Sequence, residues 1–158
     1  MHPCLPCLVS LPCLAGHPDP TQPVATVLDT WHLAAARADE EMYFSLMTAD
    51  AVFLGTDATE RWTREEFRVW AHPYFARGQA WSFHAIKRRV MLAKDQKTAW
   101  FDEELDTPNL GLARGTGVLV KEGKDWKIAH YSLTVPIPNA LMKQVTELIG
   151  KPKNFPNP

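Results

Sequence analysis

The hydrophobic pattern of the chain changes its period after Gly78, and this change constrains the fold more than any other feature. Beyond Gly78 apolar and polar residues alternate, which is the period of a β-strand with one buried face. Short turns around Asp95, Asn109 and Gly123 interrupt the alternation. The sequence therefore predicts consecutive strands that form an antiparallel meander, at residues 81–92, 98–105, 112–121 and 126–134.

Before Gly78 the apolar residues recur at three- and four-residue spacing, as they do on the buried face of a helix. Thr63 and Glu66 have the spacing of a capping box, which marks the start of one such helix. Pro136 and Pro138 end the last strand and precede a final helical stretch. Helices are expected at residues 24–38, 43–47, 63–77 and 140–149, with a short strand at 51–54.

This order of elements predicts one α+β domain. A chain of 158 residues, 46% of them hydrophobic, is long enough for one sizeable core and short for two. The strands carry more apolar area than a flat sheet could hide, so we expect a curved sheet wrapped around the N-terminal helices.

The charges of the chain exclude some classes of partner. The 17 basic and 18 acidic residues are scattered and nearly cancel, so we expect neither nucleic acid nor a membrane surface as a partner. Lys87, Arg88 and Arg89 form the only basic run, which we interpret as a solvated strand edge.

The ends of the chain differ from its middle. Residues 1–16 carry all three cysteines and no acid, Lys or Arg, and they are similar to the apolar part of a secretory signal. If this leader is a signal peptide, the protein is exported, periplasmic or secreted; otherwise it is cytoplasmic. A mis-assigned start codon or a clipped signal is the alternative for this segment. Cys4 and Cys7 lack a second pair at metal-ligand spacing, so no metal is expected there. We expect a flexible lead-in at 17–23, one domain at 24–150 and a tail at 151–158.

The stretch FLGTDATERW, residues 53–62, ends an apolar strand with polar groups and a tryptophan. It is either a plain surface turn or the rim of a pocket. With the preceding Asp50–Leu54 and the closing strand Trp126–His130, it resembles the SnoaL-like branch of the nuclear transport factor 2-like superfamily over Val24–Pro138. The resemblance implies a cone-shaped sheet with a cavity at its wide end, and it places this stretch at the cavity mouth.

Relatives implied by the resemblance use the cavity for isomerisation, cyclisation, hydrolysis or dehydration, or only for binding, so the fold leaves the function open. Aligned through the Asp50–Ala51 step, Gly55 and Trp31 stand where ketosteroid isomerase has its aspartate base and its tyrosine. Both chemical groups are absent here. We therefore do not expect that isomerase mechanism.

Asp102 and His130 are the candidate catalytic pair. Asp102 lies in the acidic strand Trp100–Asp106, and His130 alternates with Ile128 and Ser132, the face that relatives turn inward. An imidazole beside a carboxylate can move a proton near neutral pH. The alternatives are that the acids face solvent, that one pairs with Arg114, and that the histidine is structural.

A second set of residues is expected to bind ligand. Aromatic residues, among them Trp62, Trp81, Phe83 and Trp100, either line an apolar cavity or pack the core. Arg114 would clamp a carboxylate or stabilise an enolate. No metal and no cofactor are expected. The candidate ligand-binding residues are Asp57, Trp62, His84, Arg114 and Ser132.

Two functions follow. The first is a small, cofactor-independent pocket protein that binds an apolar organic molecule, with acid/base catalysis as an extension. The alternative is a non-catalytic domain that binds a ligand or another protein. Because one side of the strand containing Val118, Leu119 and Val120 must be covered, we also expect a homodimer through the outer sheet face, as the resemblance implies.

Overall fold

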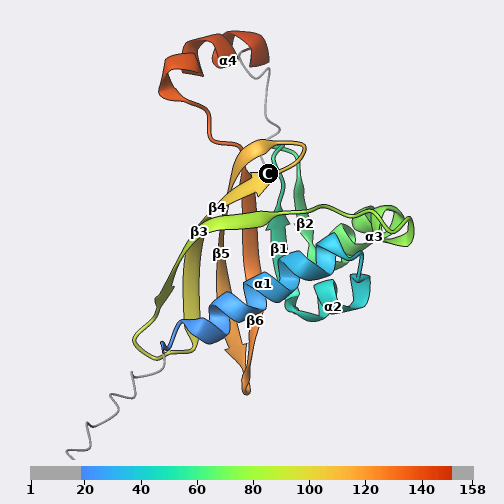
Figure 1. Ribbon diagram of the computed structural model, residues 1–158, viewed down its shortest axis with the longest axis vertical. Coiled ribbons are helices and arrows are strands. Elements are labelled where there is room, and N and C mark those ends of the chain that lie inside the picture. Colours follow the sequence, from blue (N-terminus) through green and yellow to red (C-terminus); the bar gives the residue numbers. More distant parts are fainter. Residues whose placement is uncertain (1–18, 151–158) are drawn as a thin grey trace, which may run out of the picture.

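The computed structural model describes residues 19–150, in which a six-stranded curved sheet wraps around helices (Figure 1). The strand order is β2-β1-β6-β5-β4-β3. The strands are β1 (Met47–Leu54), β2 (Arg61–Thr63), β3 (His84–Leu92), β4 (Thr98–Thr107), β5 (Gly111–Glu122) and β6 (Asp125–Thr134). The helices are α1 (Gln22–Ala36), α2 (Glu40–Ser45), α3 (Arg64–Ala76) and α4 (Met142–Ile149), with a 3-10 turn η1 (Asn139–Leu141) before α4.

The expected meander is confirmed, because β3, β4, β5 and β6 pair in sequence order and antiparallel. β1 extends this sheet by pairing parallel to β6. β2, which the sequence pattern did not predict, pairs antiparallel with β1. The polar stretch between β1 and β2 is therefore a turn at the edge of the sheet.

The helices lie close to their expected positions. α1 begins inside the expected lead-in, because Pro23 falls in its first turn, where a missing backbone N–H costs nothing. At the start of α3 the Thr63 hydroxyl accepts from the backbone N–H of Glu66, and the Glu66 carboxylate accepts from that of Thr63. The capping box is confirmed. The proposed leader 1–16 and tail 151–158 lie outside the described residues.

The core lies between α1 and the concave face of the sheet (Figure 1). On β4 the buried positions alternate with exposed ones, which turns Phe101 and Leu105 inward. α1 contributes Leu28 and Trp31, both fully buried. Trp31 packs against the ring of Tyr131 on β6 at a centroid distance of 4.7 Å. This packing fixes which residues of each strand face the interior.

α4 stands apart from the rest of the domain (Figure 1) and has no buried residue. One stripe of it, with the preceding turn, is apolar and exposed, and this stripe includes Leu141, Met142, Leu148 and Ile149. The described helices include none that is long and apolar enough to span a membrane.

Thr63→Ala should lower the free energy of unfolding by about 0.5–2 kcal/mol, because it removes one half of the capping box of α3. Thr21→Ala is the matched control, since Thr21 occupies the same position before α1 without a capping hydrogen bond from its side chain. Urea unfolding of both variants measures the difference. Equal destabilisation would contradict the role of the cap.

The expected homodimer stays a prediction, and the outer sheet face is where it is tested. Trp100 is 44% exposed there, beside the half-buried Val118, whereas Leu119 faces the core. Light scattering at micromolar concentration should give twice the chain mass, and Val118→Lys should return the monomer mass by placing a charge in an apolar contact. A monomeric wild-type protein would exclude the dimer.

Candidate functional site

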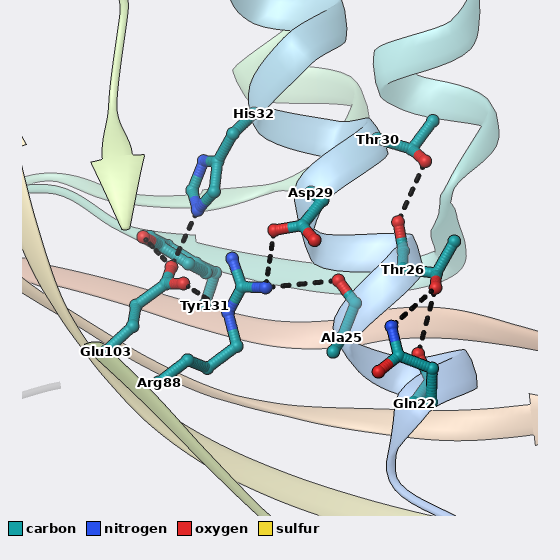
Figure 2. Close-up of polar contacts among 9 residues, drawn as sticks. All are labelled: Gln22, Ala25, Thr26, Asp29, Thr30, His32, Arg88, Glu103 and Tyr131. Carbon is teal, nitrogen blue, oxygen red and sulfur yellow. Dashed lines mark hydrogen bonds and ion pairs between the residues drawn. The ribbon is translucent and has the colours of Figure 1, made fainter. Parts of the chain in front are cut away.

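A buried polar cluster surrounds the carboxylate of Glu103 on β4 (Figure 2). Glu103 is fully buried, and its Oε1 lies 2.7 Å from Nε2 of His32 and 3.1 Å from the hydroxyl of Tyr131, which donates to it. Its Oε2 accepts from Nε of Arg88 at 2.7 Å. Residues from α1, β3, β4 and β6 thus meet at one side chain.

Strand and helix geometry bring these groups together. Glu103 follows the inward parity of Phe101 on β4, and His32 lies beside Trp31 on the buried side of α1. Arg88 reaches from β3 to α1, where Nη1 donates to Asp29 at 2.6 Å and to the backbone carbonyl of Ala25 at 3.1 Å (Figure 2). The guanidinium therefore bridges the helix and the carboxylate.

A glycine on β5 makes room for the cluster. Gly115 pairs with Glu103 across the β4–β5 ladder. A Cβ at this position would lie 2.3 Å from the Tyr131 hydroxyl oxygen and 2.8 Å from Oε1 of Glu103. Both distances are shorter than a contact allows, so only glycine fits opposite this carboxylate.

The charges around Glu103 keep it ionised. Burial alone would raise the pKa of Glu103, but the hydrogen bond from His32, together with the charge and hydrogen bond of Arg88, outweighs burial and lowers that pKa. Burial lowers the pKa of Arg88, but the carboxylates of Glu103 and Asp29 raise it by more, so the net change is an increase. The pKa of Tyr131 is raised well above its usual value, first by burial and then by Glu103. Tyr131 therefore stays a neutral donor.

Two atoms of this cluster lack a hydrogen-bond partner in the described part of the chain. They are Nδ1 of His32 and Nη2 of Arg88, and both are buried. Figure 2 shows the second ring nitrogen of His32 turned away from Glu103. Buried polar atoms are rarely left unpaired, so these two positions mark where a ligand group or water could bind.

A pocket with a volume of about 400 Å³ lies at the end of β1 beside α3 and the β4–β5 turn. We call it the aromatic pocket. The polar residues of its lining include Thr56, Glu60, Ser82 and Asn109. Aromatic rings form its wall, from Phe53, Trp62, Phe67, Trp70, Trp81 and Phe83.

A smaller pocket of about 240 Å³, which we call the histidine pocket, lies between α1 and the start of β3. His32 and Asp29 line it from the helix, and His84 lines it from β3. Phe83 lines both pockets. Its ring meets His32 edge-on at a centroid distance of 5.9 Å, so one side chain separates the aromatic wall from the imidazole.

The structure separates the candidate ligand-binding residues. Trp62 lines the aromatic pocket and His84 the histidine pocket. Asp57 is exposed in the turn after β1, where its carboxylate accepts from the backbone and side chain of Thr59. Of the expected rim, Thr56 and Glu60 line the aromatic pocket, whereas Asp57 does not.

Asp102 and His130 do not share a cavity, so their expected placement was wrong. Asp102 lies on the outer sheet face, where it pairs with Arg89 at 2.9 Å. A β-bulge at Ala129 reverses the alternation of β6, so Ile128 faces inward and His130 outward. β5 runs between the two residues, which places them about 10 Å apart, two strand spacings.

The candidate residues Arg114 on β5 and Ser132 on β6 also face outward, because the strand alternation turns their neighbours to the core. Arg114 is exposed on the outer face, opposite Glu104 and Thr134. Ser132 lies between the inward Tyr131 and Leu133, so it faces outward. Trp100 is also on this face and lines neither pocket.

The sequence interpretation missed Glu103 and Arg88. Arg88 was assigned to a solvated edge, yet its side chain is only 10% exposed and is held in the cluster. Glu103 had a readable signal, because it stands between Phe101 and Leu105 on the apolar parity of β4. Within residues 19–150 no three His, Cys, Asp or Glu side chains converge as a metal site.

Comparison with protein families matches residues 24–138 to a model described as a SnoaL-like domain. No curated protein sequence matches the chain. The family expected from the sequence motifs is therefore confirmed over most of the described residues.

Solved structures share the fold. A nuclear transport factor 2-like protein of unknown function from Pseudomonas putida has a TM-score of 0.62 and 14% identity, covering 73% of this chain and 86% of that one. A candidate dehydratase of the same superfamily from Streptomyces avermitilis has a TM-score of 0.62, 19% identity, and coverage of 75% and 96%. A candidate calcium/calmodulin dependent protein kinase II association domain from Xanthomonas campestris has a TM-score of 0.59, 22% identity, and coverage of 85% and 99%. The expected α+β cone is confirmed; identities this low show the fold alone.

Glu103→Gln should lower the free energy of unfolding by about 3–5 kcal/mol at neutral pH, because it removes the buried charge that Arg88 faces. The folded-state pKa of Glu103 is lowered, so its stabilisation is complete above the ordinary pKa of about 4.3. The difference between wild type and variant should shrink as the pH falls below that value. Urea unfolding across this pH range measures it.

Asp102→Asn is the control for this prediction, since Asp102 is the neighbouring acid on the opposite face. Its pair with Arg89 is half exposed, and its loss should change the free energy of unfolding by no more than about 1 kcal/mol. Equal effects of the two substitutions would contradict the assignment of Glu103 as the buried charge.

Proposed function

The chain belongs to the SnoaL-like family, and from that premise we propose that it binds a small apolar molecule with a flat ring in the aromatic pocket. The observation that carries the proposal is the wall of aromatic rings around a volume of about 400 Å³. Ligand pockets of this size bury most of a small organic molecule and are lined mainly by apolar and aromatic side chains.

The rings of the wall are arranged as a continuous stack. Trp62 lies 5.6 Å from Phe67 and 5.1 Å from Trp70, both in stacked orientation, and Phe53 stacks on Phe67 at 4.0 Å. Trp62 is only partly buried, so part of its indole remains exposed. A planar ligand ring would continue this stack by offset or edge-to-face contact.

The chemistry of the lining favours binding over catalysis at this pocket. Glu60 is the only ionisable residue of the lining, and its carboxylate already accepts from the backbone N–H of Asp57 at 3.1 Å. Ser82 and Asn109 add a hydroxyl and an amide to the lining, which suit a ligand with one polar substituent. Some similar folds carry the names of candidate dehydratases and of a candidate aromatic ring hydroxylase, and such activities are an extension of the proposal.

Trp62→Ala should weaken the binding of 2-naphthol, a neutral fused-ring probe, about tenfold, because it removes a stacking surface. Isothermal titration calorimetry measures the dissociation constant. Trp100→Ala is the matched control, since it removes an indole that is 44% exposed on the outer sheet face.

The proposal fails if wild type does not bind 2-naphthol, or if the two tryptophan variants bind it equally well. Urea unfolding of Trp62→Ala is measured beside the titration. A folded variant with weakened binding assigns Trp62 to the binding wall, and full-strength binding assigns it to packing alone.

A further inference from the structure

We propose that the histidine pocket is a second site, in which His32, oriented by Glu103, accepts a proton from the acidic hydroxyl of a small phenol or enol. This site is distinct from the aromatic pocket and does not depend on the function proposed for it. It uses the polar cluster, which the aromatic pocket leaves out.

The hydrogen bonds assign the tautomer of His32. A carboxylate can only accept, so Nε2 of His32 donates to Oε1 of Glu103 across 2.7 Å. A neutral imidazole carries one N–H, which leaves a lone pair on Nδ1. An imidazolium would instead leave a buried Nδ1–H without an acceptor, which is costly. In the neutral tautomer that donates to Glu103, Nδ1 therefore has a free lone pair.

A ligand hydroxyl would supply the hydrogen bond that Nδ1 lacks. His32 is 5% exposed, and its Nδ1 has no hydrogen-bond partner in the part of the chain that the structure describes. The ring lines the histidine pocket, with Nδ1 on the side away from Glu103 (Figure 2). A hydroxyl placed in the pocket would donate to this nitrogen, after a small shift of the enclosing side chains.

Titratable and charged groups face the imidazole from every element packed against it. Asp29 of α1 and Glu103 of β4 are negative, Arg88 of β3 is positive, and Tyr131 of β6 is neutral. The cluster thus carries one net negative charge while His32 is neutral, and protonation of His32 cancels it. His84 lines the pocket from β3 and is exposed.

The proton-transfer step is balanced by the ligand itself. The ligand O–H bond breaks, its electron pair stays on oxygen, and the proton forms an N–H bond at Nδ1. The oxyanion then accepts from that N–H, while Nε2–H stays on Glu103. A pocket of about 240 Å³ with apolar walls from Leu33, Ala36 and Phe83 admits one small ring bearing such a hydroxyl.

The probe for this site is 4-nitrophenol, whose phenolate absorbs visible light. Added to the full-length protein at a pH below the pKa of the probe, it should develop the phenolate band in proportion to binding. His32→Gln should weaken that binding about tenfold or more and abolish the band, because a glutamine amide can still donate to Glu103 but has no imidazole lone pair.

Two variants separate this site from its surroundings. Trp100→Ala removes an indole on the outer sheet face that lines neither pocket, and it should keep the phenolate band. Trp62→Ala should also keep it. Loss of the band in Trp62→Ala but not in His32→Gln would place the probe in the aromatic pocket, which overturns this inference and leaves the proposed function standing.

Nitrogen NMR of wild-type protein with labelled histidine tests the tautomer directly, even if His32→Gln does not fold. His32 should show a protonated Nε2 and an unprotonated Nδ1, and 4-nitrophenol should convert Nδ1 to its protonated form. A protonated Nδ1 in the free protein, or no change at either nitrogen with the probe, overturns the inference.

Discussion

The carboxylate of Glu103 is the interaction on which the arrangement of the domain depends. It receives hydrogen bonds from His32 on α1, Arg88 on β3 and Tyr131 on β6, while its own strand is β4. A fully buried carboxylate would be unstable without such partners, so the helix and the strands must all be in register before it is satisfied. One side chain therefore fixes how α1 crosses the concave face of the sheet.

Neighbouring residues make room for this carboxylate, and the core loses apolar packing there. Gly115 leaves the space that Glu103 and the Tyr131 hydroxyl occupy, so β5 gives up a core side chain there. Arg88 is paired with a second acid, Asp29, so its guanidinium contacts two carboxylates. Apolar residues of similar volume could hold the same elements together without these demands, which favours a functional reason for the cluster.

The elements of the fold could be predicted from the sequence, and much of the site could not. Period-two alternation predicted every strand of the meander. It also placed Glu103 on the same strand face as Phe101 and Leu105, which indicates a buried position. The alternation could not predict the bulge at Ala129, because the bulge arises from pairing with β5. This bulge turns His130 outward. Alternation within one strand gives two faces, and only the neighbouring strands decide which of them is inside.

The two pockets differ in how contact with water affects the energy of their linings. The lining of the aromatic pocket is mainly aromatic, so covering it with an apolar ligand is favourable. The polar cluster must instead be shielded, since its hydrogen bonds and charge pairs weaken in contact with water. Phe83 lies between the two and contacts the edge of His32. Phe83 is therefore the side chain shared by the pocket proposed to bind a planar ring and the pocket proposed to place a hydroxyl against His32.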